Sequence, residues 1–141
     1  MGSNQVTATP PAGYVVENNG GPFTEFVGPL YRKTEAAPGQ VAKAFLVLPQ
    51  HCNMAGLAHG GMLCTFLDNL FGTTAETTGS GLMVTATLNT QFLAAARAGD
   101  WVEGEAEIVR AGKRLVFLRG KLAVAGRPIL TGDACFARVG T

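Results

Sequence analysis

The sequence predicts an α+β fold in which an antiparallel sheet of about six strands wraps around one long, apolar helix. The helix is predicted over residues 62–78, where apolar residues recur at the spacing of a buried helix. Four strand-like segments follow, separated by short turns that contain glycine. Sequential hairpins form an antiparallel sheet, and a lone apolar helix must be buried against it.

The remaining elements follow from turn signals and alternation. Residues 1–21, rich in Pro, Gly, Ser, Asn and Thr, are expected to form a flexible N-terminal arm, and residues 22–141 a single domain. Pro22 begins a short helical segment that Gly28 and Pro29 end. Strands are expected over residues 31–37, 41–48, 82–93, 101–109, 114–124 and 128–139.

Composition bounds the functional classes. Of the 141 residues 47% are hydrophobic and 15% charged, a sparse charged surface that predicts a homo-oligomer with apolar surface buried between subunits. A net charge of +1 offers no general attraction to nucleic acid or to an anionic membrane. No apolar run is long enough to span a bilayer. Three cysteines without a CxxC pair indicate reduced thiols, so we expect a cytoplasmic protein.

The stretch from His51 to Gly72 carries the chemistry of the chain. It holds both histidines and a single acid, Asp68, and no lysine or arginine occurs between Lys43 and Arg97. A carboxylate in so apolar a neighbourhood is costly to bury. Two interpretations stay open: a capped or ion-paired structural residue, or a carboxylate that acts as base or nucleophile.

The start of the helix is the second candidate group. Amides at a helix N-terminus are unpaired and carry partial positive charge, and Gly60 and Gly61 let a ligand come close to them. Gly61, Cys64 and Asp68 belong to one small or polar helix stripe, in which Cys64 is interpreted as packing rather than as a nucleophile. On the preceding loop, Asn53 either orients a water or polarises a carbonyl, or forms an Asx-turn.

Several other chemistries are excluded by pattern. No serine lies in G-x-S-x-G, and the glycines form neither a phosphate-binding loop nor a dinucleotide-binding fingerprint. His51, Cys52 and His59 match no usual ligand spacing, so no metal site is expected.

The spacing N-x5-HGG-x6-D, formed by Asn53, His59-Gly60-Gly61 and Asp68, resembles the signature of the PaaI-like and THEM2-like acyl-CoA thioesterases of the hotdog-fold superfamily. The resemblance covers roughly residues 22–138. It implies a hotdog fold, dimers with a continuous sheet, and commonly a dimer of dimers, a homotetramer. It also implies active sites at the dimer interface, where the acid of one subunit faces the loop of the other.

The same resemblance implies a role for each motif residue. Asp68 would be the general base or nucleophile for thioester hydrolysis. The Gly60 amide would polarise the thioester carbonyl, with His59 beside it, and Asn53 would position water or the thioester.

Other roles follow from position in the resemblance or from charge. Thr85 falls where related enzymes often have a Ser or Thr that helps hold water, and Ala86 is the competing position. Coenzyme A is part of the substrate, and no separate cofactor is implied. Its phosphates could meet exposed cations that are otherwise ordinary surface charge; the candidates are Arg97, Arg110, Lys113 and Arg114.

The sequence therefore predicts an enzyme that hydrolyses a fatty or aryl acyl-CoA to free acid and CoA. The alternative is a non-catalytic acyl-CoA or lipid-binding module on the same fold. A hydratase is disfavoured because His51 and His59 form no suitable pair with an acid.

Overall fold

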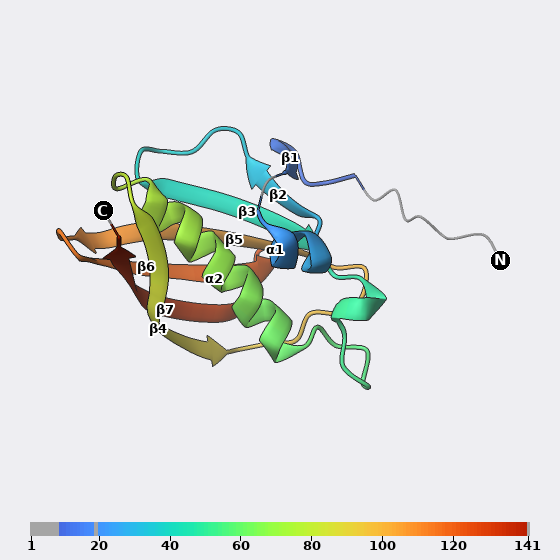
Figure 1. Cartoon of the computed structure of the whole chain (residues 1–141). Helices are drawn as coiled ribbons and strands as arrows, with labels where there is room; N and C mark the ends of the chain where they lie inside the picture. Colours follow the sequence, from blue (N-terminus) through green and yellow to red (C-terminus); the bar gives the residue numbers. More distant parts are fainter. Residues whose placement is uncertain (1–8, 19, 141) are drawn as a thin grey trace.

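The computed structural model describes residues 9–18 and 20–140. Its elements follow one another in chain order (Figure 1): β1 (Tyr14–Glu17), α1 (Pro22–Val27), β2 (Leu30–Lys33), β3 (Gln40–Leu46), the 3-10 turn η1 (Pro49–His51), α2 (Gly60–Glu76), β4 (Leu82–Phe92), β5 (Trp101–Ala111), β6 (Leu115–Val124) and β7 (Arg127–Val139). No helix among these described residues is long and apolar enough to cross a membrane.

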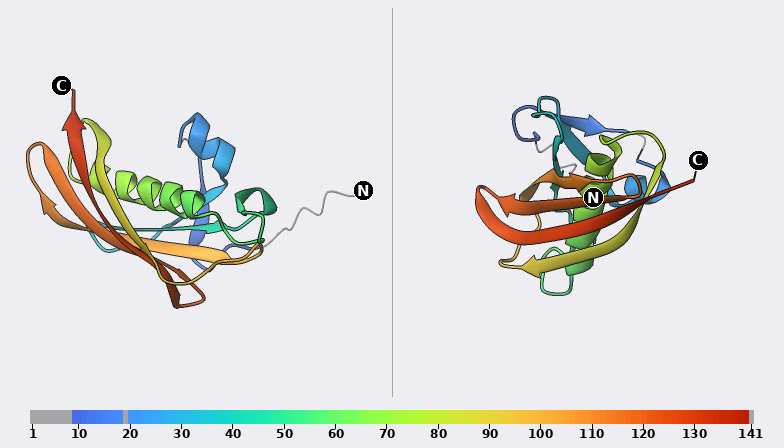
Figure 2. Two further views of the ribbon diagram at one scale, coloured as in Figure 1. Left: turned by 90° about the horizontal axis from the view of Figure 1, so that it is seen from below. Right: turned by 90° about the vertical axis from the view of Figure 1, so that its left-hand side faces the viewer.

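One antiparallel sheet of seven strands, in the order β1-β2-β3-β5-β6-β7-β4, curves around α2. Figure 2 shows the helix lying along the concave side of the sheet. This arrangement confirms the predicted hotdog fold. The strand count is seven rather than about six because β1 comes from the segment that was expected to be a flexible arm.

Strand β1 corrects the prediction for part of that arm. Residues 14–17 pair with β2 in antiparallel register, from Tyr14 opposite Lys33 to Glu17 opposite Leu30. Two β-branched valines lie between these ends, and β-branched residues favour a pleated strand. The flexible-arm prediction rested on the average composition of residues 1–21, in which this short strand-forming stretch did not stand out. Residues 1–8 of the expected arm lie outside the described part of the chain.

Helix α2 forms the centre of the core. The apolar residues predicted on its buried face are all buried: Met62, Leu63, Phe66, Leu67, Leu70 and Phe71. The helix ends at Glu76, three residues before the glycine that was predicted to end it.

Three glycines let the sheet come close to α2. Gly104, Gly120 and Gly132 lie on the neighbouring strands β5, β6 and β7. A Cβ atom at Gly120 would lie 2.9 Å from Phe71 Cε1, and one at Gly132 would lie 2.6 Å from Leu67 Cδ2. Protein interiors have little spare volume, so larger residues here would push the helix away. The glycines therefore fix how deeply α2, and Asp68 with it, sits in the sheet.

Strand β4 contains a β-bulge that the sequence did not predict. Its pairing with β7 shifts by one residue between Thr85 and Thr87, which leaves Ala86 as the extra residue. In the sequence, the apolar residues Val84 and Ala86 alternate with Thr85 and Thr87, a pattern that favours burial of the apolar pair. Instead Val84 is 38% exposed, and the side chain of Thr85 contacts the helix.

Candidate functional site

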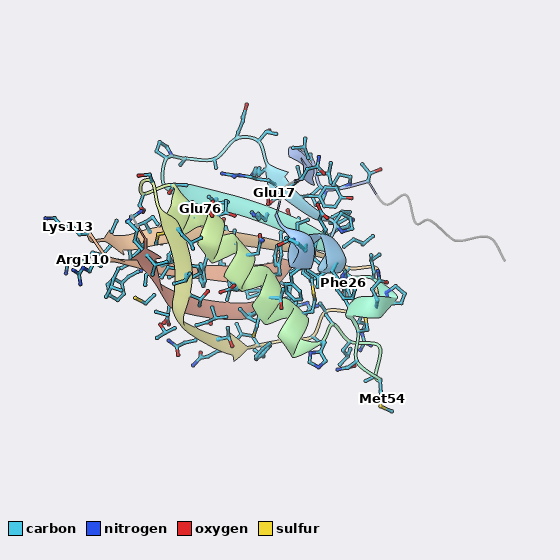
Figure 3. All side chains as sticks on the ribbon, in the orientation of Figure 1. Glu17, Phe26, Met54, Glu76, Arg110 and Lys113 are labelled. Atoms are coloured by element: carbon cyan, nitrogen blue, oxygen red, sulfur yellow. The ribbon has the colours of Figure 1, made fainter. Side chains whose placement is uncertain are left out.

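Asp68 lies midway along α2, on the side that faces β4 and the N-terminal segments. Its side chain is half-buried and borders two cavities, one of about 540 Å³ and one of about 320 Å³. The larger cavity is polar and extends along the helix toward Glu76; Figure 3 shows Glu17 and Glu76 on this side of the molecule. The carboxylate is therefore reachable rather than sealed in the core.

The partner of Asp68 is Thr85 on β4. Thr85 Oγ1 donates a hydrogen bond of 2.6 Å to Asp68 Oδ1. The bulge at Ala86 allows this contact because it turns Thr85 toward the helix. Of the two positions that the resemblance left open, the structure places Thr85 on the carboxylate. A hydroxyl donor to a carboxylate fixes its orientation and leaves its second oxygen free.

The start of α2 offers one free amide rather than two. His59 is the N-cap residue, and its Nδ1 accepts a hydrogen bond of 2.8 Å from the Gly61 amide. The expectation that Gly61 supplies a second free donor is therefore wrong. Among the hydrogen bonds of the described residues, the Gly60 amide has no acceptor. Gly60 lies against the ring of Phe92, which is 53% exposed.

Asn53 shapes the loop that leads into the helix. Its Oδ1 accepts hydrogen bonds from the amides of Ala55 at 2.9 Å and Leu57 at 3.2 Å. This is the Asx-turn geometry that the sequence left open. An isolated antiparallel β-bridge between the backbones of Cys52 and Ala58 closes the loop. Asn53 does not line either cavity beside Asp68, so this chain alone does not bring the two residues together.

His51 is a structural residue. It is buried, its Nδ1 accepts from the Leu48 amide at 3.0 Å, and its Nε2 lies 2.6 Å from the Val27 carbonyl oxygen. Both ring nitrogens are thus occupied by backbone groups. No cluster of three or more His, Cys, Asp or Glu side chains suited to a metal occurs in the described part of the chain.

The smaller cavity lies between α1, α2 and β4. Besides Asp68 it is lined by Phe23, Cys64, Thr65 and Leu88 among others. Cys64 Sγ lies 3.8 Å from a threonine hydroxyl on β4 and is only partly buried. Apolar groups next to a carboxylate give a site that can hold a non-polar group at the reacting end of a substrate.

The three candidate cations of the β5–β6 hairpin lie far from the start of α2. Figure 3 shows Arg110 and Lys113 at the tip of the β5–β6 hairpin, whereas Met54, on the loop before α2, lies at the opposite end of the molecule. Arg114 is the residue next to Lys113 in the same hairpin. Within one chain these cations therefore do not lie beside Gly60.

Lys43 was not among the site residues predicted from the sequence. This lysine is 1% exposed and lines the larger cavity together with Asp68. It points inward at the position that continues the alternation of Val41, Phe45 and Val47. A charged residue in such an apolar pattern was the available signal, because lysine is seldom buried without a partner. The charge-poor surroundings expected for Asp68 thus contain a cation brought from a distant strand.

Comparison with known proteins gives a consistent result. The family model described as Thioesterase superfamily matches residues 55–128. Human Acyl-coenzyme A thioesterase 13 is 31% identical over 101 residues, which cover 65% of this chain and 72% of that protein. The Pseudomonas aeruginosa protein PA0474 is 29% identical over 128 residues, or 89% of this chain and 95% of that protein.

A solved structure agrees with these sequence matches. A mutant form of the phenylacetic acid degradation protein PaaI from Thermus thermophilus superposes with a TM-score of 0.76 at 27% identity. The match covers 84% of this chain and all of that one. The chain therefore belongs to the thioesterase superfamily, as its signature residues and its sheet wrapped around one helix indicate.

Proposed function

We propose that this protein hydrolyses acyl-CoA thioesters to a free acid and CoA, with Asp68 as the reacting carboxylate. The observation that carries the proposal is the half-buried Asp68 held by Thr85 at 2.6 Å beside an apolar cavity. Membership of the thioesterase superfamily and the likeness to an acyl-coenzyme A thioesterase support the choice of substrate class.

The chemistry needs a base or nucleophile and a donor for the developing oxyanion. As a general base, Asp68 takes a proton from water while the water oxygen adds to the thioester carbonyl carbon. The intermediate then expels the CoA thiolate, which is protonated. As a nucleophile, Asp68 adds to the thioester carbonyl carbon and expels the CoA thiolate, and water then hydrolyses the resulting anhydride to the free acid and the Asp68 carboxylate. In both routes the Gly60 amide at the positive end of α2 would stabilise the oxyanion.

A single chain does not serve one carbonyl with both groups. Gly60 and Asp68 lie eight residues apart on the same helix, which separates them by about 12 Å along its axis. A reacting carbonyl must lie roughly 3 Å from both the donor and the attacking group. We therefore propose a homodimer, or a homotetramer built from it, in which Asp68 of one subunit faces Gly60 and Asn53 of the other.

Strand β4 is the edge that we propose for this dimer. It ends the sheet, so its outer edge is unpaired among the described strands. Leu82, Val84 and Phe92 on this strand are all well exposed. An exposed apolar edge strand is a template for pairing with another chain. Pairing two β4 strands would place the two α2 helices side by side.

The function is tested by thiol release from a panel of fatty and aryl acyl-CoAs. The wild-type protein is expected to turn over at least one class, and Asp68→Asn to lose this activity while it keeps its fold. Ligand-dependent thermal stabilisation without hydrolysis across the panel would instead favour the non-catalytic binding module. Full turnover by Asp68→Asn would exclude Asp68 as the reacting group.

Subunit complementation tests the shared site. Gly60→Pro removes the Gly60 amide at the first helical position, where proline is tolerated. Asp68→Asn and Gly60→Pro subunits are each expected to be inactive, but a refolded equimolar mixture should regain about a quarter of the wild-type activity, because each mixed dimer holds one intact site. No recovery, with mixed dimers demonstrated by mass spectrometry, would contradict the shared site.

Single turnover in water enriched in ¹⁸O separates the two routes for Asp68. A general base places the label only in the released acid. A nucleophile whose anhydride is opened by water at the Asp68 carboxyl carbon transfers one of its own oxygens to the acid in the first turnover, and the label then appears in the Asp68 carboxylate.

A further inference from the structure

Lys43 is a buried cation that the proposed chemistry does not use. It lies on β3 between Val41 and Phe45, faces the helix, and is 1% exposed. Burying an ammonium group is costly unless every N–H finds an acceptor. An apolar residue would fit the alternation at this position, so the charge itself needs a physical reason.

All three N–H groups of Lys43 are used. Its Nζ donates to a carboxylate oxygen of Glu17 on β1, to Asn69 Oδ1 at 2.7 Å and to Thr73 Oγ1 at 2.7 Å on α2. Asn69 Nδ2 in turn lies 3.4 Å from Thr24 Oγ1 on α1. The network therefore connects β1, β3, α1 and α2 through one ammonium group.

The network reaches the helical turn that carries Asp68. Asn69 directly follows Asp68 in the sequence, and Thr73 lies one turn further along the same helix. Lys43, Asp68, Asn69 and Thr85 line one cavity of about 540 Å³. Thr85 holds the Asp68 carboxylate from the side of β4, and Lys43 binds the side chain of the adjacent Asn69 from the side of β3.

The ion pair with Glu17 keeps this arrangement in place. Burial lowers the pKa of Lys43, and the adjacent Glu17 carboxylate opposes that effect. Replacing a buried ion pair with well-packed apolar residues is often neutral or stabilising. The charged pair is therefore better explained by where it fixes Asn69 than by the stability it contributes.

We propose that Lys43 is a positioning residue for Asp68: anchored by Glu17 on β1, it fixes Asn69 and the helical turn that presents the carboxylate. This inference rests on the proposed function, in which Asp68 is the reacting group. It also assigns β1 a role in positioning the site, because Glu17, which anchors Lys43, belongs to that strand.

Lys43→Met and Asn69→Ala test the network at two points. Lys43→Met removes the charge, whereas Asn69→Ala leaves the ion pair with Glu17 and the bond to Thr73, and breaks only the bond to the residue next to Asp68. The matched control is Lys121→Met, because Lys121 pairs with Glu105 at 3.2 Å, is 60% exposed, and borders neither cavity beside Asp68.

Both test variants are expected to lower kcat roughly 10- to 100-fold, with KM within about twofold, because small misplacements of a reacting group cost rate rather than binding. Lys121→Met should keep the wild-type kcat. Hydrogen exchange should become faster in the α2 amides of residues 66–73 in both test variants and stay unchanged in the control.

A merely structural role predicts a different result. Trimethylamine N-oxide favours the folded state, so a loss caused by unfolding is restored by it, whereas a misplaced carboxylate stays slow. If Lys43→Met does not fold, Asn69→Ala alone decides the question.

Two outcomes would overturn the proposal. One is an active wild-type enzyme whose Lys43→Met and Asn69→Ala variants keep kcat within twofold, or regain it in trimethylamine N-oxide. The other is unchanged hydrogen exchange in residues 66–73. If the wild-type protein hydrolyses none of the panel, the proposed function fails, and the exchange measurement still decides whether Lys43 holds this turn.

Discussion

Replacing Thr85 by valine removes the one hydrogen bond that the Asp68 carboxylate makes among the described residues, while the size and β-branching of the side chain are kept. The bond is short, at 2.6 Å, and its acceptor is a carboxylate. Without it, rotation about the Asp68 side-chain bonds is no longer restricted from the side of β4. The carboxylate would then spend less time in the orientation that the proposed mechanism requires, in which it attacks the thioester carbonyl or activates water.

The magnitude follows from the kind of bond. Hydrogen bonds to charged groups contribute about 1.5–3 kcal/mol, and partial exposure of this pair favours the lower half of that range. A loss of about 1.5–2.2 kcal/mol from the transition state corresponds to a fall in kcat of roughly 10- to 40-fold. The free energy of unfolding should change by only about 0.5 kcal/mol, because Thr85 is exposed in the chain.

The assay is the initial rate of thiol release at saturating acyl-CoA, with urea unfolding of the same preparations. Thr85→Ser is the matched control, since it keeps the hydroxyl and should stay within about threefold of wild type. A Thr85→Val enzyme with wild-type kcat would refute the reasoning, because it would show that Asp68 is oriented by other groups. Equal losses in the Val and Ser variants would refute it as well.

Three further predictions concern the frame around the site. Gly120→Ala should lower the free energy of unfolding by about 1–3 kcal/mol in urea, since its Cβ would lie 2.8 Å from a carbonyl oxygen of β5. Gly72→Ala should instead raise it by about 0.5–1 kcal/mol, because alanine favours the helix and its Cβ would lie at an ordinary contact distance of 3.5 Å from Phe136 Cε2. Equal effects of the two changes would contradict the close-approach argument. Ala125→Asn should stabilise by about 0.5–1 kcal/mol in the same assay, because Ala125 has a φ of 49° in the β6–β7 turn, and a loss would show that another contact dominates. Burial, and then the nearby Glu103, raise the pKa of Tyr14 to about 12 from its ordinary 10.0, so the folded state holds this proton more tightly than the unfolded state and the stability linked to it is lost as the pH rises from 10 through 12. The free energy of unfolding of wild type relative to Tyr14→Phe should therefore fall by about 1–2 kcal/mol between pH 9 and pH 12. A constant difference between the two proteins would exclude the linkage.

The local sequence pattern could not decide whether Thr85 or Ala86 faces Asp68. Strict alternation along residues 82–93 gives one inner face, and a single extra residue reverses it halfway along. Nothing in the local sequence marks Ala86 as the bulge. The bulge becomes visible only when β4 pairs with β7, because it is a property of two strands and not of one.

The sequence by itself determined the helix, the hairpins after it and the place of Asp68 on the helix. The apolar spacing from Met62 to Phe71 is a local pattern, and it can be read from the sequence because a helix places these residues on one face. Tertiary structure alone decided what surrounds Asp68. Lys43 arrives from β3, Glu17 from β1 and Thr85 from β4, and residues so distant in the chain meet only because the sheet curls around α2. In the sequence, no lysine or arginine lies near Asp68. The curvature of the sheet nevertheless brings Lys43 into the same cavity as the carboxylate.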